Sequence, residues 1–235
     1  MEILEIDGAK FVLDNRAGVL RGKSEDNKYV LVKTRRLLDF YESLRAEAPK
    51  NIFEIGMFEG GSLIYFDKIF EPKTIVGVDI RRKPIAALER YKKARPHIKT
   101  YYGRSQDSAQ TRGAAQSNFP EGIDLVIDDA SHLYSETKKT FENIFPLVRT
   151  GGLYVIEDWA WAHRENPTAA GTARNNRPAL TNLIFELTVL AATSRVIDRI
   201  TINGDLFCIK KGRGMLPVTK LDVSSRLRNR DMPLI

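Results

Sequence analysis

The fold is decided by one stretch, which reads Asn51-Ile52-Phe53-Glu54-Ile55-Gly56-Met57-Phe58-Glu59-Gly60-Gly61-Ser62. Its first five residues predict a short buried strand, and a helical pattern begins at its last residue. The glycines between them let the backbone turn sharply and approach a ligand closely. The helix points its unpaired amide groups into the same crevice. Strand, glycine turn and helix therefore predict the first half of a nucleotide-type site in a doubly wound sheet.

The spacing of the glycines distinguishes two classes of cofactor. The dinucleotide fingerprint is G-x-G-x-x-G, whereas Gly56, Gly60 and Gly61 give G-x-x-x-G-G. An acid, Glu54, stands two residues before the first glycine. This pattern favours S-adenosylmethionine, whose amino-acid end carries a cation that a carboxylate can meet, over NAD. An ordinary tight turn between a strand and a helix stays open as the alternative.

The totals of the chain exclude several classes of protein. The formal net charge is +7, but the basic residues come in small scattered groups, which favours a solvated surface over a nucleic-acid site. One cysteine excludes an internal disulfide framework and a Cys-rich zinc site. The N-terminus lacks the basic start of a signal peptide, and no apolar run approaches the roughly 20 residues of a membrane span. We therefore expect a cytoplasmic protein.

Strand and helix patterns alternate along most of the chain. They predict a Rossmann-like α/β fold, a doubly wound, mostly parallel seven-stranded sheet with helices on both faces and a C-terminal antiparallel hairpin. The expected strands are 51–55, 74–79, 98–102, 123–127, 153–156, 196–202 and 206–210, and the expected helices are 33–47, 62–70, 84–94, 108–120, 135–145 and 178–192. We expect an N-terminal extension at 1–32, a main domain at 33–214 with an acceptor loop or lid at 164–178, and a tail at 215–235.

Polar residues follow the ends of two strands near the glycine turn. Asp79 ends the second main strand, close to the roughly 20-residue separation expected for the acid that binds a ribose. An acid in this position can also be a helix cap. Ser105 and Gln106 follow the third strand, where polar side chains could reach an adenine edge or could only form a turn and a cap.

Further acids follow the fourth and fifth strands, namely Asp128, Asp129, Glu157 and Asp158. Carboxylates at neighbouring strand ends repel one another unless a cation or a proton intervenes. Magnesium is the natural partner of such oxygen ligands. Side chains alternate along a strand, so Asp128 and Asp129 should not both face the metal. His132 can act over the same crevice as a general base.

Four motifs together resemble the class I S-adenosylmethionine-dependent methyltransferases. They are Phe53-Glu54-Ile55-Gly56 with Gly60-Gly61-Ser62, Val76-Gly77-Val78-Asp79, Ile127-Asp128-Asp129-Ala130-Ser131-His132, and Gly151-Gly152-Leu153-Tyr154-Val155-Ile156-Glu157-Asp158. More narrowly, they resemble the magnesium-dependent sugar O-methyltransferases of the mycinamicin and macrocin type, with relatives among the rhamnosyl and mycobacterial polysaccharide methyltransferases and the cephalosporin hydroxylase group. The resemblance implies metal ligands Asp129, Glu157 and Asp158 and the base His132. From the glycine turn and the strand ends we expect the donor-site residues Glu54, Gly56, Met57, Gly60, Gly61, Ser62, Asp79, Ser105, Gln106 and Asp128.

The expected reaction is transfer of the sulfonium methyl group to a sugar hydroxyl, with Mg²⁺ and His132 activating the hydroxyl. The acceptor would be a small molecule or oligosaccharide with vicinal hydroxyls, and Tyr134, Trp159, Trp161 and His163 could form its wall or could pack a lid. Three alternatives stay open: a phenol, RNA or protein acceptor, a nicotinamide oxidoreductase, and a non-catalytic subunit on the same scaffold. A homo-oligomer is compatible with the sequence.

Overall fold

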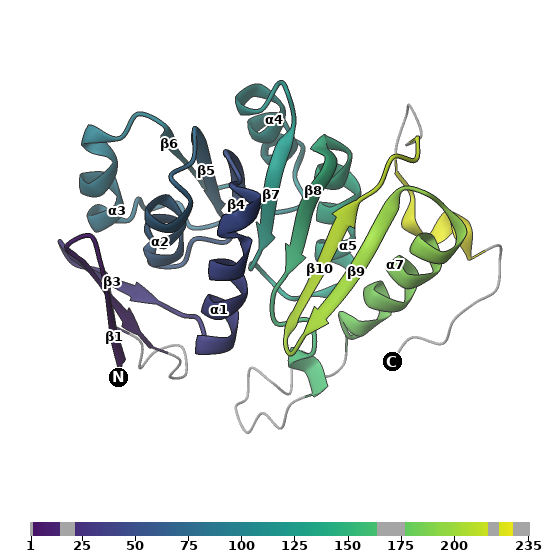
Figure 1. Cartoon of the computed structure of the whole chain (residues 1–235), viewed down its shortest axis with the longest axis horizontal. Coiled ribbons are helices and arrows are strands. Elements are labelled where there is room, and N and C mark those ends of the chain that lie inside the picture. Colours follow the sequence, from purple (N-terminus) through teal and green to yellow (C-terminus); the bar gives the residue numbers. More distant parts are fainter. Residues whose placement is uncertain (1, 15–21, 164–176, 216–220, 228–235) are drawn as a thin grey trace. The chain divides into compact units, whose positions relative to one another are not determined.

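The computed structural model describes residues 2–14, 22–163, 177–215 and 221–227 (Figure 1). Residues 164–176 of the expected loop, and 216–220 and 228–235 of the expected tail, lie outside the described residues. The strand order of the main sheet is β6-β5-β4-β7-β8-β10-β9, and a separate three-stranded sheet has the order β1-β2-β3. The chain divides into two compact units, an N-terminal unit, Met1–Ser105, and a C-terminal unit, Gln106–Ile235, which are described in turn.

The N-terminal unit contains three parallel strands of the main sheet, β4 (Asn51–Ile55), β5 (Thr74–Asp79) and β6 (Ile98–Tyr102). Helices α2 (Gly61–Phe70) and α3 (Ala86–Tyr91) connect them. β4 and β5 are apolar on both faces and almost wholly buried, as in strands that helices cover on each side. This arrangement places the glycine turn and Asp79 at the carboxyl ends of neighbouring strands.

The N-terminal extension forms its own small sheet. Strands β1 (Glu2–Ile6) and β2 (Ala9–Leu13) make an antiparallel hairpin, and β3 (Lys28–Leu31) pairs in parallel with β2. Helix α1 (Arg35–Ser43) follows, with Thr34 capping its first turn. Phe11 of β2 packs edge-on against Tyr65 of α2, with ring centroids 5.7 Å apart. The extension is therefore part of the core of the N-terminal unit.

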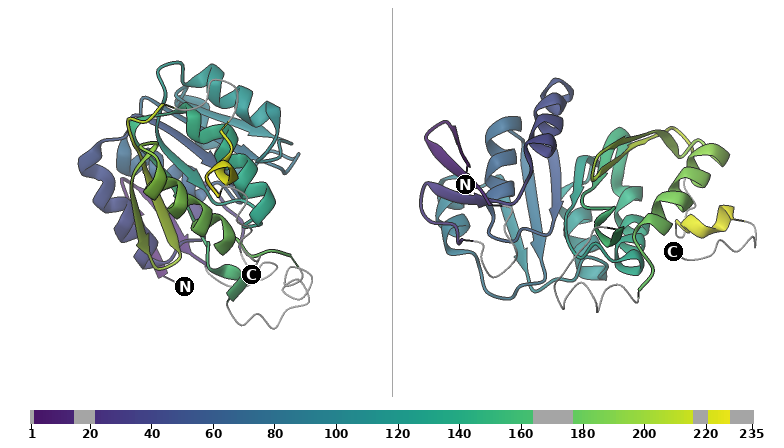
Figure 2. Two further views of the ribbon diagram at one scale, coloured as in Figure 1. Left: turned by 90° about the vertical axis from the view of Figure 1, so that its right-hand side faces the viewer. Right: turned by 90° about the horizontal axis from the view of Figure 1, so that it is seen from below.

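The C-terminal unit contains β7 (Ile123–Asp128) and β8 (Val148–Ile156), which are parallel, and the antiparallel strands β10 (Leu206–Lys211) and β9 (Ile197–Asn203). Its helices are α4 (Ala109–Asn118), α5 (Tyr134–Ile144) and α7 (Thr181–Thr193). Helix α7 lies beside the β9–β10 hairpin in the views of Figures 1 and 2. The short turn Val223–Arg226 packs against α7.

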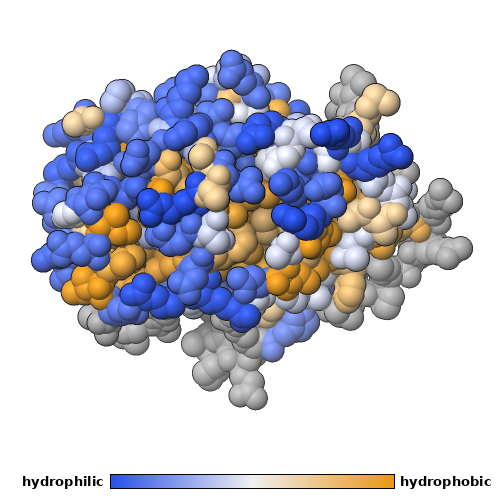
Figure 3. All heavy atoms as spheres, in the orientation of Figure 1, coloured by the Kyte–Doolittle hydropathy of each residue, from blue (hydrophilic) through white to orange (hydrophobic). Residues whose placement is uncertain are grey.

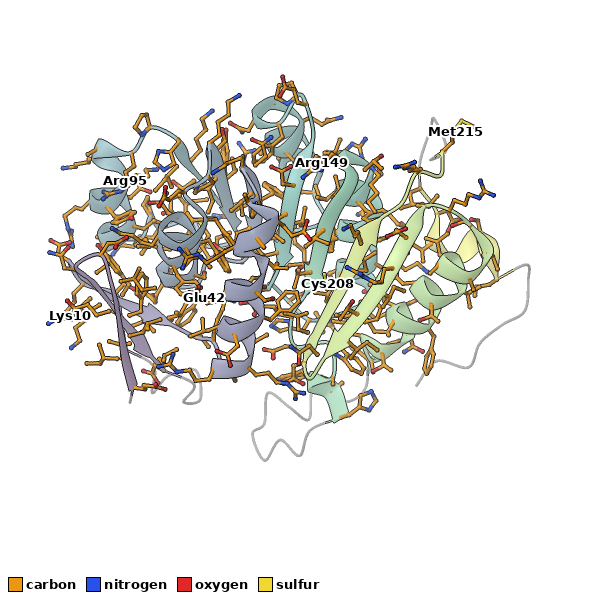
Figure 4. The ribbon with its side chains drawn as sticks, in the orientation of Figure 1. Lys10, Glu42, Arg95, Arg149, Cys208 and Met215 are labelled. Carbon is orange, nitrogen blue, oxygen red and sulfur yellow. The ribbon has the colours of Figure 1, made fainter. Side chains whose placement is uncertain are left out.

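The predicted fold class is confirmed, and several strand boundaries agree to the residue. One boundary was wrong, because Gly151 and Gly152 do not precede the fifth strand but lie within β8, which begins at Val148. A register irregularity between Ile123 and Leu125 accommodates them. Cys208 is buried in β10, as expected of a core residue (Figure 4), and burial raises the pKa of its thiol to about 12.

Polar and charged side chains cover most of the face drawn in Figure 3, with apolar groups between them. In the described part of the chain, we find no helix with the length and apolar character needed to cross a bilayer.

Candidate functional site

The glycine turn between β4 and α2 depends on two glycines for different reasons. Gly60 has φ +78°, in the left-handed region that residues with a Cβ rarely adopt, and its amide donates to the Met57 carbonyl at 2.7 Å. At Gly61 the reason is space, since an added Cβ would lie 2.0 Å from the Val30 carbonyl oxygen. The turn can therefore form only because β3 approaches the start of α2 without a side chain between them.

Asp79 locks this turn from the end of β5. Its Oδ2 accepts the backbone amides of Met57 at 2.9 Å and Phe58 at 3.1 Å. Its Oδ1 accepts the amide of Arg81 at 2.8 Å. Hydrogen bonds to an ionised acceptor are stronger than neutral ones. The carboxylate is thus held in place by the polypeptide itself and organises the backbone of the glycine turn.

Glu59 is a residue of the turn that the sequence analysis missed. Its Oε1 accepts from Arg81 Nη2 at 3.1 Å, and its Oε2 accepts from the Ser24 amide at 3.4 Å. The side chain of Glu59 is only 13% exposed. Its position inside a glycine turn was the available signal, but its partners are distant in sequence. The hydrogen bond between Ser24 and Glu59 joins the N-terminal extension to the glycine turn.

The other residues of this unit that were predicted to bind the methyl donor are buried or half-buried. Glu54 is fully buried on β4, and Met57 is 1% exposed, with its amide donating to Asp79 and its carbonyl accepting from the Gly60 amide. Ser62 lies in the first turn of α2, and Ser105 is the last residue of the unit. Gln106 and Asp128, also predicted for the donor, lie in the C-terminal unit.

The C-terminal unit brings three predicted residues together after β7 and β8. Asp129, His132 and Asp158 each offer a ligand atom, and these atoms lie within 4.8 Å of one another. His132 Nε2 lies 3.7 Å from Asp129 Oδ1 and 4.0 Å from Asp158 Oδ2. Both distances are too long for hydrogen bonds. They fit the roughly 3–4 Å separation of two ligands that share one ion at about 2.1 Å.

Two members of this cluster have an uncommon backbone conformation. His132 has φ +56° and Asp158 has φ +51°. A residue with a Cβ is strained in this region, and such strain concentrates at functional sites because the surrounding structure must hold it. The loops after β7 and β8 therefore turn their side chains into one cluster at a conformational cost.

Asp128 and Glu157 are adjacent to the cluster in sequence but are buried, each 2% exposed. Tyr154 Oη donates to Asp128 Oδ2 at 2.8 Å. Burial raises the pKa of the Asp128 carboxyl to about 7, against the lowering effect of this hydrogen bond, and the nearby Asp129 and Glu157 raise it further. Asp128 lies outside the group formed by Asp129, His132 and Asp158. Glu157 lies outside the group of three.

The predicted acceptor residues make contacts within the C-terminal unit. Tyr134 Oη donates to Glu186 Oε1 at 2.8 Å, and the Trp159 indole Nε1 donates to the Gly204 carbonyl at 2.9 Å. His163 Nε2 bonds Thr181 Oγ1, and Trp161 begins the short helical turn that ends at His163. Trp159 thus fastens the segment after Asp158 to the β9–β10 turn.

Comparison with known proteins finds a family model that matches part of the chain. Residues 53–159 match a methyltransferase domain. The 8-demethyl-8-(2-methoxy-alpha-L-rhamnosyl)-tetracenomycin-C 3'-O-methyltransferase of Streptomyces olivaceus is 36% identical over 115 residues, 49% of this chain and 27% of that protein. The demethylmacrocin O-methyltransferase of Streptomyces fradiae is 38% identical over 99 residues, 42% of this chain and 23% of that protein. The matches thus span about a quarter of these relatives.

Solved structures of methyltransferases share the fold. The MycE methyltransferase from the mycinamycin biosynthetic pathway, in complex with Mg and SAH, has a TM-score of 0.56 and 26% identity, covering 79% of this chain and 52% of that one. An O-methyltransferase from Bacillus cereus, in complex with SAH, has a TM-score of 0.53 and 16% identity, covering 76% and 82%. The second likeness concerns the fold alone.

Proposed function

We propose that this chain is an S-adenosylmethionine- and Mg²⁺-dependent O-methyltransferase that acts on a sugar hydroxyl of a glycosylated small molecule or oligosaccharide. The observation that carries the proposal is the cluster of Asp129, His132 and Asp158 within a chain that matches a methyltransferase domain. The names of the sugar O-methyltransferases that it resembles support the acceptor class.

The N-terminal unit would hold the donor. We assign the turn from Gly56 to Ser62 to the amino-acid end of the donor and Asp79 to its ribose. A carboxylate offers about four acceptor positions, and three backbone amides already use the Asp79 carboxylate. The ribose hydroxyls would therefore share this carboxylate with the turn, which couples donor binding to the turn's conformation.

The C-terminal unit would hold the metal and move the proton. We assign Asp129, Asp158 and Glu157 as ligands, and the oxygen-rich donor set fits Mg²⁺. When bound, Mg²⁺ would supply a Lewis acid that lowers the pKa of an acceptor hydroxyl. His132 Nε2 would accept the proton of that hydroxyl as the oxygen bonds to the sulfonium methyl carbon. The bond between that carbon and sulfur would break, and S-adenosylhomocysteine would leave. The competing assignment makes His132 a third ligand in place of Glu157, because its Nε2 belongs to the group of three.

Calorimetry with Mn²⁺ and S-adenosylhomocysteine tests the binding half of the proposal. The wild-type chain should bind both, and chelation should abolish methyl transfer until Mg²⁺ is restored. Under our assignment Glu157→Gln weakens Mn²⁺ binding, while His132→Ala keeps it and lowers turnover by about 10²–10⁴-fold. The opposite pattern would make His132 a ligand.

A screen of acceptors tests the other half. Diol-containing glycosides, catechols and RNA would be compared with labelled S-adenosylmethionine. Preference for glycosides supports the proposal, whereas preference for a phenol or RNA would keep the donor and metal assignments and replace the acceptor. Full activity in EDTA would remove the metal from the mechanism.

A further inference from the structure

Gln106 is a buried side chain that connects two parts of the C-terminal unit. It is 8% exposed and precedes α4. Its Oε1 accepts the Ser131 backbone amide at 3.0 Å, and its Nε2 donates to Thr140 Oγ1 of α5 at 3.2 Å. Ser131 lies between Asp129 and His132 in the loop after β7. Gln106 therefore bridges the body of α5 and the loop that carries the proposed base.

The partners determine which way the Gln106 amide points. The Ser131 backbone N–H can only donate, so the atom facing it must be the oxygen. The Thr140 hydroxyl gives its proton to the Glu136 carbonyl, at 2.7 Å, so it accepts from the Gln106 nitrogen. A flipped amide would lose both hydrogen bonds.

The loop needs such an anchor because its backbone is strained at His132, where φ is +56°. A strained residue keeps its conformation only if neighbouring contacts hold it. Ser131 has one contact inside the loop, where its Oγ accepts the Leu133 amide at 3.3 Å, and one outside it, which is made by its backbone amide. Gln106 is that partner.

We propose that Gln106 is a positioning residue that holds the Asp129–His132 loop in the conformation where Asp129 and His132 face Asp158. The inference rests on the proposed function, because that proposal gives Asp129 and His132 their roles in catalysis. This role differs from contact with the adenine of S-adenosylmethionine. Loss of an adenine contact would lower the affinity for the cofactor, whereas loss of a loop anchor would disturb the group of Asp129, His132 and Asp158.

Gln106→Met tests this role, since it removes both hydrogen bonds at similar side-chain volume. We expect faster hydrogen exchange at the Ser131 amide, about tenfold weaker Mn²⁺ binding, and binding of S-adenosylhomocysteine without metal within twofold of wild type. Gln106→Glu keeps an acceptor for the Ser131 amide and should restore its slow exchange.

Asn143→Leu is the matched control. Asn143 Nδ2 donates to the Asp107 carbonyl at 3.1 Å, so it ties the same segment to α5 without touching the loop. This variant should leave Mn²⁺ affinity unchanged. Equal weakening by Asn143→Leu and Gln106→Met would mean a general loss of stability and would overturn the inference.

Three other outcomes are informative. If Gln106→Met leaves both Mn²⁺ binding and hydrogen exchange at the Ser131 amide unchanged, the inference is overturned. If only S-adenosylhomocysteine binding weakens, by about tenfold, Gln106 contacts the cofactor instead.

Failure of the wild-type chain to bind Mn²⁺ would refute the proposed metal site. Hydrogen exchange at the Ser131 amide would still decide whether Gln106 anchors the loop. If Gln106→Met does not fold, Thr140→Val keeps the hydrogen bond between Gln106 and the Ser131 amide but removes the two made by the Thr140 hydroxyl, to Gln106 and to the Glu136 carbonyl. This variant should weaken Mn²⁺ binding about threefold, and an unchanged affinity would count against the inference.

Discussion

The two units stabilise their acids in different ways. In the N-terminal unit, Asp79 accepts hydrogen bonds from three backbone amides, those of Met57, Phe58 and Arg81. In the C-terminal unit, Asp129 and Asp158 lie 3.7 and 4.0 Å from His132, beyond hydrogen-bond range. The first acid is bonded to the backbone around it, whereas the second pair is the one that we propose for the metal. Removing an acid should therefore affect stability in one unit and metal binding in the other.

The largest expected effect comes from Asp158→Asn. Asparagine tolerates the positive φ of this position, so the backbone should keep its conformation. We expect turnover and Mn²⁺ affinity to fall by at least about 100-fold, because one charged ligand is lost. The free energy of unfolding in EDTA should not decrease, since a like charge near Asp129 has been removed. A clear loss of stability in EDTA would show that Asp158 serves the fold, as Asp79 does.

Asp79→Asn should have the reverse signature. Its amide nitrogen would face a backbone donor, so at least one charge-assisted hydrogen bond is lost and the free energy of unfolding should fall by about 2–3 kcal/mol. S-adenosylhomocysteine binding should weaken, and Mn²⁺ binding should persist. Asp26→Asn is the control, because the ion pair of Asp26 with Arg90 is exposed and should contribute less than about 1 kcal/mol. Equal effects of the two variants would contradict the comparison.

The C-terminal unit also contains a buried amine whose pKa is shifted toward neutral pH. Lys211 at the end of β10 is buried, donates to the carbonyls of Pro146 and Val148, and burial lowers its pKa from 10.5 to about 8. Because the unfolded chain binds this proton more tightly, the charge opposes folding below pH 8, and the opposition is lost as the pH rises toward 10.5.

Urea unfolding at pH 7.5 and 9.5 measures this effect. Wild-type stability should rise relative to Lys211→Met by about 1–2 kcal/mol over that interval. Lys210→Met, at the neighbouring position, controls for the loss of one positive charge. Parallel pH profiles for wild type and Lys211→Met would place the lysine charge in a hydrated environment.

The sequence predicted the elements better than the contacts between them. Apolar, β-branched runs identified β4 and β5, because burial on both faces leaves a local pattern. The pairing of β3 with β2 had no such signal, since Lys28–Leu31 is short and begins with a charged residue. Strand ends that meet at one sheet edge predicted a cluster of Asp129, Glu157 and Asp158, whereas the group in the structure contains Asp129, His132 and Asp158.

The supporting contacts could not be predicted in the same way. Glu59 and Ser24, or Gln106 and Ser131, lie far apart along the chain, and no periodicity connects them. Only the folded backbone determines which of several polar residues an amide will meet. This is why the sequence placed Gln106 at the donor, whereas its observed partners lie in the loop of His132 and in α5.

The smallest expected effect concerns the segment that follows Asp158 in the group of Asp129, His132 and Asp158. Trp159 follows Asp158, its indole donates to the Gly204 carbonyl at 2.9 Å, and its amide donates to the Asp205 carbonyl at 3.4 Å. Trp159→Phe removes only the indole hydrogen bond, and we expect a loss of about 0.5–1.5 kcal/mol in stability and a two- to fivefold weaker Mn²⁺ affinity. Calorimetry with Mn²⁺ checks this, with Trp161→Phe as the neighbouring aromatic control. An unchanged affinity would mean that the hairpin turn does not help to place Asp158, and that the strained backbone at Asp158 is held from β8 alone.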